Sequence, residues 1–172
     1  MELTRSLILD IELYLRNNYE EEIVYALRNC SYEECRSSSK EEDECFGLNI
    51  HLDRINAFID ETWQETVLRL IDEKELKDSY VYKKASISKQ TFSKIRSNVN
   101  YQPNKDTAIQ ICFGLELNLD NSLDLLSKAG FTLSKSIKRD VVIKYFLEHK
   151  IYDIDVINEY FHKMNYKLFP IN

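Results

Sequence analysis

Glycine and proline are scarce in this chain, with three glycines and two prolines among 172 residues. β-Sandwiches and barrels turn the chain often, and tight turns depend on these two residues. Rossmann and P-loop domains need glycine where the backbone approaches a phosphate. The composition therefore excludes these classes and favours an all-α fold.

Long apolar runs and catalytic signatures are also missing. No stretch approaches the roughly 18 consecutive apolar residues that a membrane span needs, and the first five residues do not begin a cleavable secretion signal. We therefore expect a cytoplasmic protein without a membrane partner. The sequence contains no nucleophile elbow, HExxH motif or P-loop, so we predict no enzymatic activity, no catalytic residue and no cofactor.

Cysteine is present but not in a metal-binding pattern. Cys30, Cys35, Cys45 and His51 would be the ligands of a structural zinc, the less favoured alternative. Their spacings do not match paired C-x₂-C motifs, and the segment between them is acidic and loop-like. We interpret these residues as reduced thiols, place Cys112 in the core, and predict no metal site.

The net charge of −6 is unevenly distributed along the chain. Residues 1–60 hold 14 acidic and 6 basic residues, whereas residues 61–172 hold 15 acidic and 17 basic residues. Residues 79–105 contain no acid, and their bases are Lys83, Lys84, Lys89, Lys94, Arg96 and Lys105. Because local potential matters more to a phosphate than net charge does, this window is a candidate nucleic-acid surface.

Helical spacing of apolar residues divides the chain into two regions. Residues 1–60 form an acidic helical region, with helices expected over 3–28 and near 48–59 and a mobile loop near 29–46. In residues 61–172, Thr62 and Glu65 form a capping-box pattern ahead of an apolar stripe. The next helix is expected to be capped by Asp78 or Ser79 and to run through residue 85. Gly130 is expected to end the helix over 119–129. The other helices are expected over 89–97, 105–115, 135–148 and 153–163.

Residues 81–96 are typical of two short helices joined by a tight turn at 86–88, with Ser88 as the predicted N-cap of the second helix. In such a unit a small residue, an apolar residue in the turn and two apolar residues of the second helix form the inner face, roles that Ala85, Ile87, Phe92 and Ile95 can fill. Glutamine pairs with adenine, Lys and Arg reach guanine or phosphate, and a helix N-terminus suits a phosphate. The predicted nucleic-acid-binding residues are Lys83, Lys84, Ser88, Lys89, Gln90, Ser93, Lys94, Arg96, Tyr101 and Lys105.

These segments resemble a known family. Residues 68–130 resemble the five-helix lambda-repressor-like (XRE-type) domain. The segments that carry this resemblance are residues 70–74, 85–88 and 91–96, and Pro103 ahead of a helix. Residues 62–165 are also similar to a C-terminal helical module of bacterial proteins that sometimes follows a macro domain. The resemblance implies a five-helix helix-turn-helix domain followed by two C-terminal helices, and the apolar spacing of residues 3–28 places an N-terminal helical extension ahead of it.

The chain departs from the DNA-binding members of that family at three places. Ser86 stands where many have glycine, and Arg96 stands where a glutamate is usual. Tyr80 and Val81 occupy the position of a common phosphate-binding glutamine. The missing glutamine removes one expected contact with the DNA backbone.

Two functions therefore remain open. The first is a DNA-binding transcriptional regulator, with RNA as another nucleic-acid partner and the N-terminal region serving dimerisation or signal input. The second is a protein-interaction module on a degenerate helix-turn-helix fold, in phage–host conflict or stress response, whose acidic residues 41–44 sequester a basic partner. Aromatic residues of the last two helices fit either the core or a homodimer face: Tyr145, Phe146, Tyr152, Tyr160 and Phe161.

Overall fold

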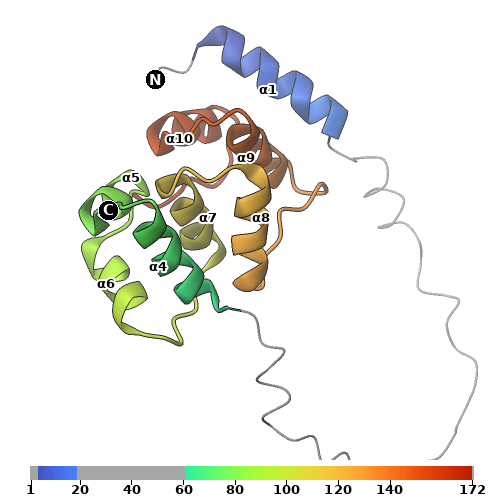
Figure 1. Ribbon diagram of the computed structural model, residues 1–172. Coiled ribbons are helices and arrows are strands. Elements are labelled where there is room, and N and C mark those ends of the chain that lie inside the picture. Colours follow the sequence, from blue (N-terminus) through green and yellow to red (C-terminus); the bar gives the residue numbers. More distant parts are fainter. Residues whose placement is uncertain (1–3, 19–60, 172) are drawn as a thin grey trace, which may run out of the picture. The chain divides into compact units, whose positions relative to one another are not determined.

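The computed structural model describes residues 4–18 and 61–171, and every regular element in these ranges is a helix. The helices are α1 (Arg5–Asn18), α4 (Trp63–Glu73), α5 (Asp78–Lys84), α6 (Lys89–Ser97), α7 (Lys105–Gly114), α8 (Leu119–Lys128), α9 (Lys138–Glu148) and α10 (Ile154–Lys163) (Figure 1). The predicted all-α class is confirmed for this part of the chain. The expected loop near 29–46 and helix near 48–59 lie outside the described residues. None of the described helices could cross a membrane, because none is long and apolar enough.

Helix α4 begins at the predicted capping box. The Thr62 hydroxyl accepts a hydrogen bond from the Glu65 N–H at 3.2 Å, and the Glu65 carboxylate accepts one from the Thr62 N–H at 2.9 Å. Two N–H groups that would lack partners at a helix start are thereby satisfied. The helix then buries Trp63, Val67 and Ile71, which share one face.

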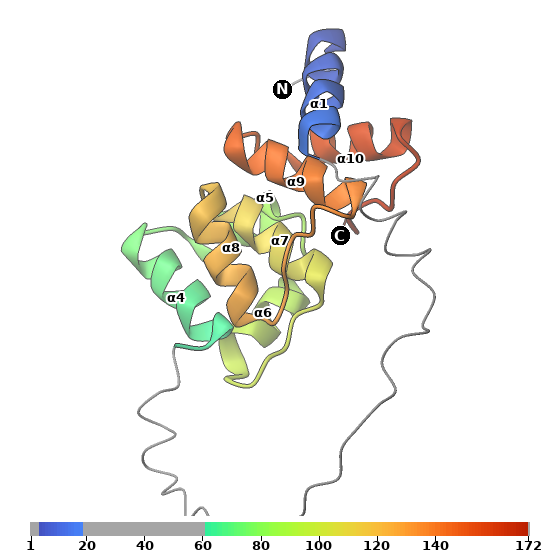
Figure 2. The same cartoon turned by 90° about the vertical axis from the view of Figure 1, so that its right-hand side faces the viewer.

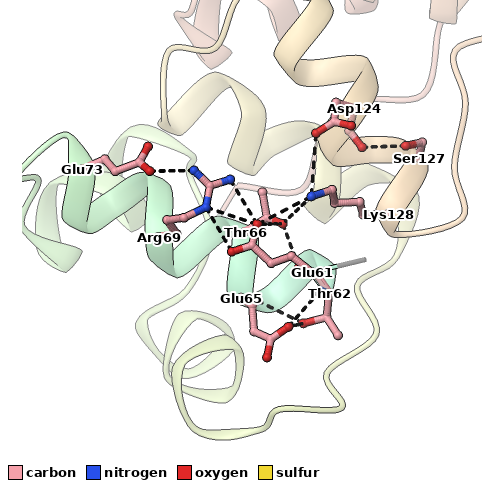
Figure 3. Close-up of polar contacts among 9 residues, drawn as sticks. All are labelled: Glu61, Thr62, Glu65, Thr66, Arg69, Glu73, Asp124, Ser127 and Lys128. Atoms are coloured by element: carbon pink, nitrogen blue, oxygen red, sulfur yellow. Dashed lines mark hydrogen bonds and ion pairs between the residues drawn. The ribbon is translucent and has the colours of Figure 1, made fainter. Parts of the chain in front are cut away.

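A polar network fastens the start of α4 to α8 (Figure 3). The Glu61 carboxylate accepts hydrogen bonds from Arg69 at 3.0 Å and from the Thr66 hydroxyl at 2.9 Å, and Lys128 of α8 lies 3.6 Å from it. Lys128 also donates to the Thr66 hydroxyl at 3.1 Å. The hydrogen bond from Arg69 is the main reason why the pKa of Glu61 is lowered. This carboxylate therefore stays charged and joins two helices that pack together.

The central helix of the bundle is α7, whose residues 107–114 are all buried. It packs against α5 on one side and α8 on another. A Cβ atom at Gly114 would lie 2.7 Å from the Ala85 Cβ and 3.0 Å from the Val81 carbonyl oxygen. Real Cβ contacts are not that short, so α5 and α7 approach this closely only because residue 114 has no side chain. The small Ala85 thus serves the contact with α7.

Helices α9 and α10 cover one end of the α4–α8 bundle, as two perpendicular views show (Figures 1 and 2). Tyr145, Phe146, Tyr160 and Phe161 are buried, which confirms the core interpretation for these four aromatic residues; Tyr152 is partly buried. The C-terminal segment is bound to this layer. Asn158 bonds both to the N–H of Phe169 at 2.8 Å and to its carbonyl oxygen at 3.1 Å.

Helix α1 contacts α9. Its Leu7 and Ile11 are buried, and the Tyr14 ring meets the Tyr145 ring edge-on, with 5.2 Å between the ring centroids. This helix belongs to the predicted N-terminal region of residues 1–60, and in the structure it packs against α9.

Two predicted helix boundaries were wrong. Helix α5 is preceded by Lys77, which makes no side-chain cap, so neither Asp78 nor Ser79 is the N-cap. Helix α9 begins at Lys138, three residues after the predicted start. The reason is Asp140, whose carboxylate accepts the Ser134 N–H at 2.9 Å and so holds the preceding segment in a loop.

Candidate nucleic-acid interface

Helices α5 and α6 are joined by the four residues 85–88, close to the predicted turn. Ser86 has a φ of 53°, in the left-handed region that favours glycine. The Ile87 N–H reaches back to the Tyr82 carbonyl oxygen at 3.0 Å, which closes the turn. Ser88 is the N-cap of α6, as predicted, and its hydroxyl accepts the Thr91 N–H at 3.0 Å. The local sequence thus specifies an abrupt change of direction between the two helices.

The turn and the inner face of α6 are packed against the core by three apolar residues. Ile87, Phe92 and Ile95 are 4%, 3% and 0% exposed, which matches the roles assigned to them. The far end of α6 is held by Gln64 of α4, whose buried amide donates to the Ile95 carbonyl oxygen at 3.0 Å. Sequence reasoning missed Gln64, because no motif marks a partner that lies 31 residues away. Helix α6 is therefore anchored at both ends.

The outer face of α6 carries five of the predicted residues in exposed positions: Lys89, Gln90, Ser93, Lys94 and Arg96. Within the described residues neither Lys89 nor Lys94 has an acidic partner. The ammonium groups of lysines without acidic partners are available to bind an external anion. This face combines two ammonium groups with an amide and a hydroxyl, the groups that contact phosphates and base edges.

Arg96, at the end of α6, forms an intramolecular ion pair with Asp78. Its Nη2 lies 2.6 Å from the Asp78 Oδ1 and its Nε lies 3.1 Å from the Asp78 Oδ2. This two-point hydrogen bond is the main reason why the pKa of Arg96 is raised. Because Asp78 begins α5, the pair fixes the start of α5 against the end of α6. Arg96 therefore orients the two helices in this structure.

Three further predicted residues also have intramolecular partners. Lys84 is paired with Glu116 and donates to the Tyr80 hydroxyl at 3.0 Å. Lys105 lies 2.6 Å from the carboxylate of Asp140, whose side chain is 3% exposed. Tyr101 is partly buried beside the core, and burial raises the pKa of its phenol.

Residues 79–105 contain no acidic residue, but in the folded structure acidic side chains from other segments lie next to some of their bases. Three of the six bases are balanced by acids that lie outside residues 79–105 in the sequence. In the described part of the chain the remaining three, Lys83, Lys89 and Lys94, have no acidic partner. The candidate surface is therefore narrower than the charge count suggests, and it centres on the first half of α6.

Among residues 4–18 and 61–171, no three His, Cys, Asp or Glu side chains lie close enough together to hold a metal ion. The ring of His149 stacks on Tyr145 with 3.9 Å between centroids, and its Nδ1 lies 2.8 Å from the Tyr145 carbonyl oxygen. His162 is exposed. Cys112 is fully buried, as predicted, and burial raises the pKa of its thiol to about 12. Cys30, Cys35, Cys45 and His51 lie outside the described residues.

Comparison with known proteins adds no relative to this picture. No protein-family model, curated protein or solved structure matches the chain.

Proposed function

We propose that the protein is a DNA-binding transcriptional regulator and that α6 is its recognition helix. The observation that carries this proposal is the outer face of α6, where Lys89, Gln90, Ser93 and Lys94 are exposed while Phe92 on the opposite face is buried. The major groove admits one α-helix, and it is read by such a polar face when the helix is rigidly held. Anchoring by Gln64 and Ile95 supports that rigidity.

The residues divide into two roles under this proposal. Lys89 and Lys94 contact phosphates or guanine, and Gln90 pairs with adenine. Lys83, at the end of α5, extends the phosphate contacts. Arg96 sets the angle between α5 and α6 through Asp78 and does not itself reach the DNA.

Few unpaired cations per chain imply weak binding by a single copy. The salt dependence of binding reflects the number of phosphates neutralised, and three lysines neutralise at most about three. Two copies on adjacent half-sites would double that number, as in other two-fold helix-turn-helix complexes. We therefore expect binding to be stronger to a site that accommodates two copies than to half of that site.

The test is fluorescence anisotropy of labelled duplex DNA, both random and from the region upstream of the coding sequence, at low and at physiological salt. We expect saturable binding that Lys89→Glu/Lys94→Glu abolishes. The control is Lys144→Glu/Lys163→Glu, which makes the same charge change on α9 and α10 and should retain most of the affinity. If both double variants lose binding equally, the attraction is not local to α6 and the proposal is wrong.

The second candidate is a protein-interaction module on the same framework. The observation in its favour is that Lys84, Arg96 and Lys105 are neutralised within the chain, which leaves a smaller positive surface than DNA binding commonly uses. Helix-turn-helix frameworks serve several functions, so the fold does not decide between the two. Absence of DNA binding at both salt concentrations would favour this second candidate.

A further inference from the structure

A cavity of about 480 Å³ opens between the C-terminal end of α5 and the connection from α9 to α10. Lys83, Lys84 and Ser86 line it on the α5 side, and Lys150 and Tyr152 line it on the other. Its volume lies within the range of roughly 300 to 1,000 Å³ that is common for small-molecule sites. Of the residues assigned to DNA contact in the proposal above, Lys83 lines this cavity, whereas Lys89, Gln90 and Lys94 of α6 do not.

The cationic groups of the cavity come from two segments that are far apart in the sequence. Lys83 and Lys150 are both exposed, and within residues 4–18 and 61–171 neither has an acidic partner. Lys84 is engaged by Glu116, so it lines the cavity as half of an ion pair. Two lysines without an acidic partner in the described residues therefore line one concave space.

The acidic groups of the cavity are partly compensated. Asp153 is the N-cap of α10, and its carboxylate accepts the Asp155 N–H at 3.0 Å and the Val156 N–H at 3.5 Å. A carboxylate in this position is stabilised by the positive end of the helix dipole, which offsets its repulsion of another anion. Asp155 is exposed in the first turn of α10 and remains free to accept a hydrogen bond from a hydroxyl group.

We propose that this cavity binds a small phosphate monoester. Lys83 and Lys150 hold the phosphate as point charges, and Ser86, which lines the same space, supplies a hydroxyl that can donate to it. Tyr152 and Asp155 line the same space and suit the apolar body and hydroxyl groups of a polyol ester. A phosphate of a DNA backbone has the same chemistry, but a concave site favours the small molecule. The proposal goes beyond DNA binding through α6 and does not depend on it.

The test is isothermal titration calorimetry of the full chain with inorganic phosphate and with pyrophosphate, at constant ionic strength in chloride. We expect one saturable site per chain for pyrophosphate and at least a tenfold higher Kd after Lys150→Glu. Lys150 has a φ of 56°, and Glu75 and Glu116 adopt φ values of 51° and 50°, so glutamate is compatible with this backbone. An unchanged circular dichroism spectrum and Tm would verify folding.

The matched control is Lys77→Glu, the same charge reversal at the opposite end of α5, which should change the Kd less than twofold. An equal loss in Lys77→Glu and Lys150→Glu, or no saturable binding of either probe, overturns the site. If Lys150→Glu weakens duplex DNA binding while pyrophosphate does not bind, the phosphate belongs to nucleic acid and the small-molecule assignment is wrong. Retained pyrophosphate binding by Lys89→Glu/Lys94→Glu would show that the cavity and α6 act separately.

Discussion

The close approach of α5 to α7 makes Gly114→Ala a sharp test of the packing described above. The new Cβ would lie 2.7 Å from the Ala85 Cβ and 3.0 Å from the Val81 carbonyl oxygen, a main-chain atom that cannot rotate away. Overpacking of this kind typically costs about 1–3 kcal/mol. Replacing glycine by alanine gains up to about 1 kcal/mol of helix propensity, but less here because Gly114 is the last residue of α7. We expect a net destabilisation of about 1–2 kcal/mol.

Urea denaturation of the two single variants and the double variant measures this effect. Ala85→Gly removes the shortest of the three close contacts, so Ala85→Gly/Gly114→Ala should be more stable than the sum of the single changes predicts, by about 1 kcal/mol. The Val81 contact remains in the double variant, so rescue should be incomplete. A Gly114→Ala protein as stable as the wild type, or strictly additive variants, would contradict a steric clash between α5 and α7 at residue 114.

The remaining predictions concern the caps, the turn and one ion-pair cluster. Thr62→Ala removes half of the capping box and should destabilise the chain by about 1 kcal/mol in the same urea assay, whereas Glu65→Asp, which keeps a carboxylate, should cost less. Ser86→Gly relieves a left-handed backbone and should leave stability unchanged or raise it by up to about 1 kcal/mol; a clear loss would contradict this. Burial opposes ionisation of Asp106, but the hydrogen bond from Lys167 and the charge of Arg139 outweigh it, so its pKa is lowered in the folded state. The charged Asp106 therefore contributes fully to stability above its pKa in the unfolded chain, about 4. This contribution is lost as the pH falls through its pKa in the folded state. Asp106→Asn should therefore destabilise the protein at pH 7, whereas in acid its stability should approach that of the wild type.

Local signals in the sequence predicted much of the secondary structure. The capping box at Thr62, the N-cap at Ser88 and the end of α8 at Gly130, which has a φ of 75°, are all as expected. Each of these depends on residues within one helical turn, so periodicity and cap chemistry suffice to locate them. The boundary of α9 was missed because it depends on a hydrogen bond from the Ser134 N–H to the Asp140 carboxylate, which competes with helix formation.

The candidate site was less accessible from the sequence, for the same physical reason. A charge count over residues 79–105 leaves out the acidic residues that pair with its bases, because those acids lie outside this range in the sequence. Asp78 lies 18 residues from Arg96, and Asp140 lies 35 residues from Lys105. Which lysines remain unpaired is a property of the packed helices. The exposed polar face of α6, by contrast, follows from helical spacing around Phe92 and Ile95, so it could be predicted.

The measurement that tests the DNA-binding proposal most directly is a titration of ¹⁵N-labelled protein with duplex DNA, followed by amide chemical shifts. The account predicts that the largest shift changes occur at residues 88–97 and are lost in Lys89→Glu/Lys94→Glu. Changes confined to α9 and α10, or no changes at a DNA excess in low salt, would contradict the assignment of α6 as a recognition helix.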